Sequence, residues 1–314
     1  MDAIETPIFL VGSLRSGSTL LRLMLDHHPD IAFCSDSEFL VTHISEAGEF
    51  PEISAYRAAL AADRVFRHGR YEVDPDLNFQ NLVKDFLHQK LQRDEKSIVG
   101  ATVHYQFAKL KHIWPNAKYI YLYRDGRDVA NSVVKMGWAG NSYVGADWWL
   151  NAEREWNFVR SRIPADSWIE VQFEKLTSDT GMELQRICDF IGVPYSNRMF
   201  EYVLNSSYSL PDVSANYKWR RSMQLKDLRM IEAKLASSLR NRGYEPSGQP
   251  PLQVGALGER LIYSHSRLFA VKDRIARFGP WLVLQELISR RLGILGWNRR
   301  LARSIDDIVD RNLH

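Results

Sequence analysis

Cysteine is scarce in this sequence: only Cys34 and Cys188 occur among its 314 residues. The two stand far apart and lack the close spacing of metal-binding cysteines. The sequence therefore predicts neither a disulfide framework nor a zinc site. We expect two buried free thiols and no bound metal.

Long apolar runs are also missing. No stretch approaches the roughly 20 apolar residues that a membrane-spanning helix needs. The first residues are acidic where a secretory signal would be basic, and the apolar run that follows extends only from Ile8 to Val11. These patterns predict a soluble protein with a cytoplasmic location.

A large excess of charge of one sign is absent as well. The chain has 41 Lys and Arg against 38 Asp and Glu, and a net charge of +3 gives no support for a nucleic-acid partner. The charge is uneven, however. Residues 247–314 carry 11 basic and 6 acidic residues, a local net charge of +5.

Apolar runs and helical periodicities alternate along residues 1–246. Strands are expected at 8–11, 118–123 and 168–173, and helices at about 20–25, 78–91, 107–114, 126–134, 182–191 and 225–239. This alternation predicts an α/β fold with a parallel sheet covered by helices on both faces. We therefore expect one domain over residues 1–246.

A Pro- and Gly-containing linker at 247–251 separates this domain from the C-terminal residues. Beyond the linker, helices are expected at about 257–278, 281–292 and 299–308. Apolar stripes recur at helical spacing there, in residues 284–288 and 301–309. We expect residues 247–314 to form a helical extension that buries these stripes against the domain at residues 1–246 or a second subunit.

The loop after the first strand predicts an anion-binding site. In the segment from Gly12 to Leu21, small residues connect a strand to a helix, and their N–H groups and hydroxyls can converge on an anion at the helix N-terminus. Arg15 adds planar, two-pronged recognition of phosphate or sulfate oxygens. A helix cap alone would explain one hydroxyl, but not an Arg with three. No Lys follows a glycine here, which argues against a nucleotide-triphosphate loop and a P-loop kinase.

The segment from Pro7 to Leu21 resembles the 5′-phosphosulfate loop of sulfotransferases that use 3′-phosphoadenosine 5′-phosphosulfate (PAPS). It is most similar to bacterial sulfotransferases related to tyrosylprotein sulfotransferases, and residues 24–31 also fit that family. The resemblance implies the sulfotransferase fold, a P-loop-like parallel sheet flanked by helices. It also implies PAPS as the donor, PAP as the product and no metal. It assigns the 5′ end of the donor to Arg15, Ser16, Gly17, Ser18, Thr19 and Leu20.

A second motif, residues 121–132, resembles the segment with which this family binds the 3′-phosphate. The resemblance gives that role to Arg124 and Ser132. An Arg at the carboxyl end of a strand also lies where ligands bind in open parallel sheets. We expect Asp125, Arg127 and Asp128 to form a surface ion-pair cluster of little energetic weight.

Three further segments extend the resemblance to about residue 246. Residues 173–176 resemble the family's Tyr-Glu-Asp-Leu, with Phe173 near the adenine, and residues 217–220 align with a basic, Trp-containing segment that closes over the cofactor. Lys218 or Arg220 would contact phosphates there, although a solvated basic turn explains them equally well. Residues 242–244 resemble the family's closing Leu-Gly-Tyr.

Sulfuryl transfer needs stabilisation of developing negative charge and a base for the attacking hydroxyl. Arg15 meets the first need. In related enzymes the catalytic base is a Glu shortly after a His-Pro pair, and a gapless alignment from His28-Pro29 places this position at Asp36. Glu38 is the alternative base. His104 is a third candidate for a catalytic role. The family often has a Lys in the strand before the second motif, residues 100–104 contain none, and His104 would take over part of its polar role.

The expected reaction is transfer of a sulfuryl group from PAPS to a hydroxyl of a small-molecule acceptor, such as a metabolite, carbohydrate or lipid. The sequence does not identify the acceptor, whose pocket we expect to be lined by residues 46–70 and by Trp138, Tyr143, Trp148, Trp149 and Trp156. A nucleotide-binding module without catalysis is the alternative. For the basic C-terminal extension, contact with an anionic membrane surface ranks second to burial against protein or homo-oligomer formation.

Overall fold

Parallel strands form the centre of the computed structural model, which describes residues 4–292 and residue 301. Within these residues the strands form one five-stranded sheet in the order β2-β3-β1-β4-β5. Their bounds are β1 Ile8–Val11, β2 Ile31–Asp36, β3 Ile98–Val103, β4 Lys118–Tyr123 and β5 Trp168–Gln172. Every pairing is parallel, so the carboxyl ends of the strands lie at one edge of the sheet.

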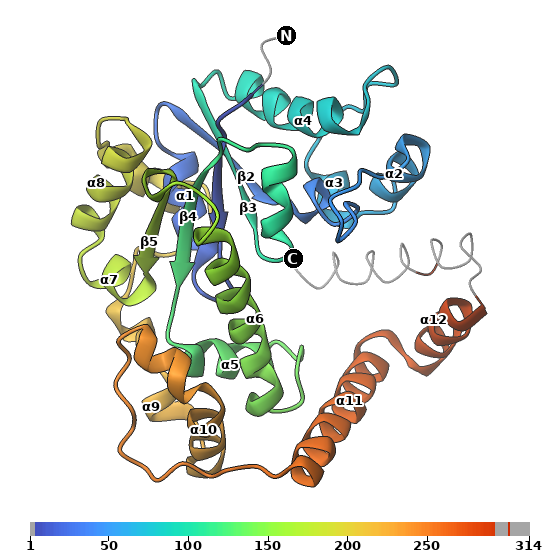
Figure 1. Cartoon of the computed structure of the whole chain (residues 1–314), viewed down its shortest axis with the longest axis vertical. Coiled ribbons are helices and arrows are strands. Elements are labelled where there is room, and N and C mark those ends of the chain that lie inside the picture. The colour runs from blue at the N-terminus through green and yellow to red at the C-terminus, as the bar shows by residue number, and fades with distance from the viewer. Residues whose placement is uncertain (1–3, 293–300, 302–314) are drawn as a thin grey trace.

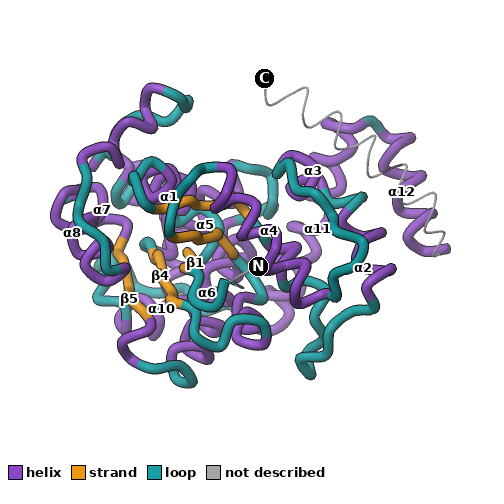
Figure 2. The backbone as a smooth tube through the Cα atoms, turned by 90° about the horizontal axis from the view of Figure 1, so that it is seen from above, coloured by secondary structure: helices purple, strands orange, loops and turns teal. Residues whose placement is uncertain are grey.

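Helices cover both faces of this sheet, as the view from above in Figure 2 shows. The helices that flank the sheet are α1 Ser18–Asp26 and α8 Thr180–Ile191 on one face and α4 Phe79–Arg93 on the other. The alternation of side chains along β1 explains the two layers. Ile8 and Leu10 pack with α1 and α8, whereas Phe9 and Val11 pack with α4. The predicted α/β fold is confirmed.

A third apolar cluster joins helices near the carboxyl edge of the sheet. It is built from α5 Gly126–Lys135, α6 Ser142–Arg160 and α10 Leu225–Asn241. Val129, Trp149 and Leu235 are fully buried there. This cluster fixes α5, and with it the segment that leaves β4.

Shorter elements complete the domain. They are α2 Ile53–Leu60, α3 Arg64–His68, α7 Phe173–Ser178 and α9 Trp219–Ser222, with 3₁₀ turns η1 Glu38–Leu40, η2 Phe107–His112, η3 Ala165–Ser167, η4 Asn197–Leu204 and η5 Val213–Ala215. The segment 107–114, which we predicted as a helix, is the 3₁₀ turn η2. Both cysteines are buried and free.

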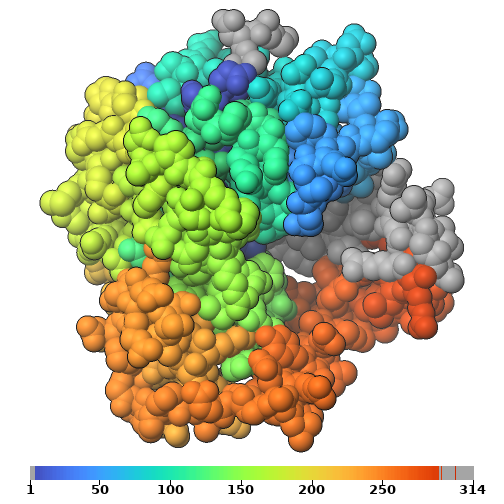
Figure 3. Space-filling model, viewed as in Figure 1, coloured from blue at the N-terminus to red at the C-terminus, as the bar shows by residue number. Residues whose placement is uncertain are grey.

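Two helices follow the linker, α11 Ala256–Phe278 and α12 Pro280–Leu292, and they extend as an arm along one side of the body (Figures 1 and 3). Polar contacts attach α11 to the segment before α6: the Gly140 N–H donates to Ser266 Oγ at 2.9 Å, and Asn141 donates to the Ile262 carbonyl at 3.1 Å. These contacts hold α11 on the catalytic domain.

The apolar stripe of α12 is not covered by the part of the chain that the structure describes, and its burial against a second subunit stays a prediction. Leu284, Leu287 and Ile288 are 40–47% exposed, while Val283 is buried. The reason is that α12 packs on α11 through a face different from this stripe. The helix expected at 299–308 lies outside the described residues. Among the helices that the structure describes, none is both long and apolar enough to cross a bilayer.

Candidate functional site

The loop between β1 and α1, residues 12–17, needs glycine at both ends. Gly12 has φ 146°, and a Cβ there would lie 2.2 Å from the Leu122 carbonyl oxygen of β4. Gly17 has φ 94°, and a Cβ there would lie 2.4 Å from the ring of Phe173. The loop therefore packs tightly against β4 and α7, which fixes the direction in which α1 begins.

The N-terminus of α1 is open to an anion. Gly17 is the N-cap residue, and no described side chain caps the helix. The Ser16 hydroxyl is buried and has no hydrogen-bond partner among the described residues. Because the first N–H groups of a helix need acceptors, they and the Ser16 hydroxyl can bind phosphate or sulfate oxygens. By contrast, the Asp125 side chain caps α5.

Arg15 and Arg124 bring the two predicted phosphate motifs together. Arg15 Nε donates to Ser132 Oγ at 3.0 Å, across 117 residues of sequence. The Arg124 guanidinium lies over the Phe173 ring at 4.3 Å, and its Nε is buried without a partner among the described residues. Two cationic side chains, one from the loop after β1 and one from the residue after β4, thus face one space.

That space is a pocket of about 400 Å³, called here the donor pocket. It is lined by Leu14, Arg15, Gly17, Ser18, Thr19, Leu20, Asp36, His104, Arg124, Trp138, Phe173, Thr177, Tyr208, Ser209, Leu210, Pro211, Asp212, Ala215 and Lys218. Most of the residues predicted to bind the donor are among them. Ser132 instead contacts Arg15, and Ser16 is buried in the loop.

Arg220 does not line the donor pocket. Its guanidinium lies over the rings of Tyr217 and Trp219, at 5.2 and 5.3 Å. Sequence reasoning missed the pocket wall formed by residues 208–212. That segment carries no glycine-rich or basic pattern that would mark it, and only the fold brings it to the site.

Asp125, Arg127 and Asp128 form a buried network, so our prediction of a surface cluster is wrong. The three are at most 3% exposed, and Arg127 pairs with Asp125 at 2.7 Å. Asp128 accepts the N–H groups of Lys218 and Trp219 at 3.1 and 2.7 Å. Burial arises because α10 and the segment before α9 close over the start of α5. The network therefore holds Lys218 at the donor pocket.

His104 is the centre of a polar cluster at the carboxyl ends of β2 and β3. Its Nδ1 lies 3.1 Å from the Gly12 carbonyl oxygen, so this nitrogen carries the proton. Its Nε2 lies 3.5 Å from Asp36 Oδ1 and 3.4 Å from Ser18 Oγ. Glu38 Oε1 accepts the backbone N–H of His104 at 3.0 Å. Asp36 faces the donor pocket, whereas Glu38 fixes the backbone.

The pKa values in this cluster move in opposite directions. Burial favours the neutral form of His104, but the hydrogen bond to Asp36 and the nearby carboxylates raise its pKa above the ordinary 6.5. Burial likewise opposes ionisation of Asp36, yet His104 lowers its pKa. Burial raises the pKa of Glu38, and His104 offsets only part of this effect. Asp36 and His104 thus form a charged pair.

A second pocket of about 490 Å³ adjoins the donor pocket. Leu14 and His104 line both. Tyr105 and Trp148 give the second pocket partly exposed aromatic walls. Trp149 and Trp156 do not line this pocket as we expected, because they are fully buried in the core.

Residues 7–197 of this chain match a protein-family model that is described as the sulfotransferase family. A similar curated protein is protein-tyrosine sulfotransferase A of Caenorhabditis elegans, 24% identical over an alignment of 275 residues that covers 78% of this chain and 68% of the relative. Protein-tyrosine sulfotransferase 1 of Danio rerio is 25% identical over 279 residues, covering 78% of this chain and 74% of the relative.

Solved structures share the fold. The sulfotransferase domain of the Synechococcus PCC 7002 olefin synthase is similar with a TM-score of 0.58 and 21% identity, over 77% of this chain and 96% of that domain. The sulfotransferase domain from the curacin biosynthetic pathway gives a TM-score of 0.55 and 20% identity, over 78% of this chain and 99% of that domain.

Proposed function

The chain belongs to the sulfotransferase family, and we propose that it transfers a sulfuryl group from PAPS to a hydroxyl of a small-molecule acceptor and releases PAP. The observation that carries this proposal is the meeting of Arg15, Ser132 and Arg124 at one pocket that adjoins a second pocket at His104. Two cationic subsites in the donor pocket suit a nucleotide that carries phosphate groups at both ends. The wall that the two pockets share, at Leu14 and His104, suits transfer between two bound molecules.

The residues of the donor pocket fit PAPS. The Ser16 hydroxyl, the uncapped N-terminus of α1 and Arg15 would hold the phosphosulfate end. Arg124, Ser132 and Lys218 would hold the 3′-phosphate. The unpartnered, buried Nε of Arg124 supports this assignment, because buried donors usually have a partner. Phe173 lines the pocket and supports Arg124 from below its guanidinium plane.

Asp36 is the group that would take the proton of the acceptor, and His104 would hold the Asp36 carboxylate in place. When bound, PAPS supplies the sulfuryl group: a new S–O bond to the acceptor oxygen forms, the S–O bond to the 5′-phosphate breaks, and PAP leaves. Asp36 faces the donor pocket and His104 faces both pockets, so a hydroxyl between them reaches the Asp36–His104 pair. Arg15 would stabilise the charge that develops on the sulfuryl oxygens.

Calorimetry with PAP is the first test. We expect tight binding that survives EDTA, because arginine side chains and helix N–H groups bind phosphates without a metal. Binding that appears only with Mg²⁺ would refute the sulfotransferase mechanism proposed here. PAP binding without sulfate transfer to any acceptor, peptide tyrosine included, would favour a non-catalytic module.

Substitutions separate binding from chemistry. Arg124→Ala should mainly weaken PAP affinity, whereas Arg15→Ala should also slow turnover, because only Arg15 would touch the transferring group. Losses of equal size confined to the cofactor KM of both variants would contradict this division.

The base is tested with Asp36→Ala, which should lower kcat by a factor of about 10²–10⁴ while PAP binding stays near that of the unmodified protein. Glu38→Gln is the matched control, because Glu38 holds the His104 backbone and does not line the donor pocket. If Glu38→Gln loses turnover and Asp36→Ala keeps it, Glu38 is the base.

A further inference from the structure

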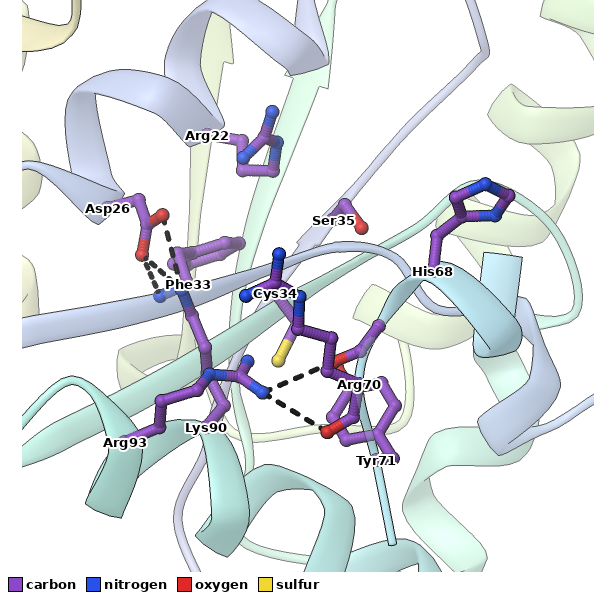
Figure 4. A pocket seen from close by; sticks show the side chains of 11 residues that line it. Arg22, Asp26, Phe33, Cys34, Ser35, His68, Arg70, Tyr71, Lys90 and Arg93 are labelled. Carbon is purple, nitrogen blue, oxygen red and sulfur yellow. Dashed lines mark hydrogen bonds and ion pairs between the residues drawn. The ribbon is translucent and has the colours of Figure 1, made fainter. Parts of the chain in front are cut away.

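A separate basic pocket of about 300 Å³ lies beside β2, the strand at the edge of the sheet. Its cationic side chains come from three places in the fold: Arg22 from α1, Arg70 from the segment after α3, and Lys90 and Arg93 from α4. Figure 4 shows these side chains gathered around one space, with Ser35 at its border. None of the four lines the donor pocket.

The acids near this pocket neutralise only part of its charge. Asp26 lines it and pairs with Lys90 at 2.9 Å, and Asp94 pairs with the same Lys90 at 2.7 Å. The guanidinium groups of Arg22 and Arg70 form no hydrogen bond or ion pair with any residue that the structure describes. Two fixed positive charges therefore remain in a small space, where their repulsion would be relieved by an anion.

The backbone of Arg70 is held in an unusual conformation. Its φ of 55° lies in the left-handed region, which side chains other than glycine rarely adopt. Arg93 Nη1 donates to the carbonyl oxygens of Gly69 and Arg70, at 3.2 and 3.4 Å, and so fixes this turn. Conformations of this kind persist where neighbouring contacts enforce them, and they are frequent at ligand clamps.

The basic pocket adjoins the proposed catalytic group. Ser35 lines the pocket, and Asp36, the next residue of β2, lines the donor pocket. Arg22 lies one turn along α1, whose first residues form the donor pocket. Arg22 is also near enough to Asp36 to lower the pKa of that carboxyl, so an anion bound here would lie close to the proposed base.

We propose that the basic pocket is a binding site for a phosphate- or sulfate-type oxyanion, and that this oxyanion is a group of the acceptor. The acceptor class is therefore a hydroxyl compound that already carries such a group. The proposal rests on the proposed function. The same chemistry would also bind a free oxyanion, and the experiment separates these two sources.

Inorganic phosphate is titrated by calorimetry into PAP-saturated protein, so that the donor pocket is filled. We expect one further phosphate site, and Arg70→Gln or Arg22→Gln should weaken it by about tenfold or more, the effect of losing one charged hydrogen bond. Arg240→Gln, which changes an exposed Arg on α10, is the matched control and should have no effect. Absence of the site, or equal weakening by Arg240→Gln, would overturn the proposal.

Transfer assays then compare a phosphorylated hydroxy compound with its unphosphorylated parent. If the oxyanion belongs to the acceptor, kcat/KM is higher for the phosphorylated compound, and Arg70→Gln removes about tenfold of that preference. If phosphate binds but no such preference exists, the acceptor assignment is wrong and the site takes a free oxyanion. Failure of PAP to bind would refute the proposed function alone, since the Arg70-dependent phosphate site is measurable in its absence.

Discussion

Replacement of Asp128 by Ala tests how the buried network supports the donor pocket. The carboxylate accepts the N–H groups of Lys218 and Trp219 and lies 3.5 Å from Arg124 Nη2. Ala would leave the buried N–H of Trp219 and the partly buried N–H of Lys218 without an acceptor, at about 1–3 kcal/mol each. Burial already raises the pKa of Asp128, so keeping its carboxylate ionised in the folded protein costs free energy. The net loss of stability therefore falls in the lower part of the range summed over the two donors. We expect a loss of about 2–4 kcal/mol in the free energy of unfolding.

PAP affinity should fall by about tenfold or more in the same variant, because Lys218 and Arg124 both lose their anchor. Urea unfolding gives the first quantity and calorimetry the second. Asp128→Asn keeps one acceptor oxygen and should be intermediate, which covers the case in which the Ala variant does not fold. Asp166→Ala, at an exposed acid of η3, is the control. A loss below about 1 kcal/mol together with unchanged PAP affinity would refute the reasoning.

Three further outcomes are expected. The pKa of His104 in the folded protein lies above its ordinary value of 6.5, so the stabilising effect of its charge is complete below that pH and is lost as the pH rises through the folded value. The difference in unfolding free energy between the unmodified protein and His104→Gln should therefore shrink as the pH rises above about 6.5, and a constant difference would count against the ion pair. Gly17→Ala should lower the free energy of unfolding by about 1–2 kcal/mol or more and weaken PAP binding, because the new Cβ meets Phe173. Gly181→Ala, where a Cβ would have nothing within 4 Å, should leave stability and PAP binding unchanged or slightly improved, and equal effects of the two changes would refute the steric argument. A chain truncated after Pro250 should lose solubility or its oligomeric state. In a flotation assay with anionic liposomes the full chain should bind only weakly, and strong flotation that the truncation abolishes would establish membrane contact instead.

Several elements could be predicted because their signals are local. Residues 8–11 and 118–123 are apolar or aromatic runs followed by turn residues, and they are β1 and β4. Helical spacing likewise predicted α4, α8 and α10, with ends within a few residues of those observed. The β1–α1 loop is also local, and Gly12 and Gly17 have the backbone angles that only glycine adopts easily. The family resemblance also assigns Arg15 and Arg124 to the donor, and both side chains line one pocket.

Other features were missed because they depend on contacts between distant segments. The segments Ile31–Asp36 and Ile98–Val103 were not predicted as strands, and they become β2 and β3 by pairing with each other and, for β3, with β1. Aromatic residues of α6 suggested a pocket wall, yet Trp156 stacks on Tyr121 in the core. Charge patterning within a single turn could not show that α10 covers Arg127, where Glu232 completes the network.

The sequence by itself determined three of the five described strands, several helices and the glycine loop, because hydrophobic periodicity and backbone conformation act over a few residues. The assignment of Arg124 to the donor came from the family resemblance. The tertiary structure decided which polar groups work together. His104 gained a role only when the parallel pairing of β2 and β3 brought Asp36 within 3.5 Å of its ring. The basic pocket arose in the same way, since Arg22, Arg70 and Arg93 are neighbours only after α1 and α4 pack on opposite faces of one edge strand. Such charges interact through space, and their distances are set by packing rather than by position along the chain.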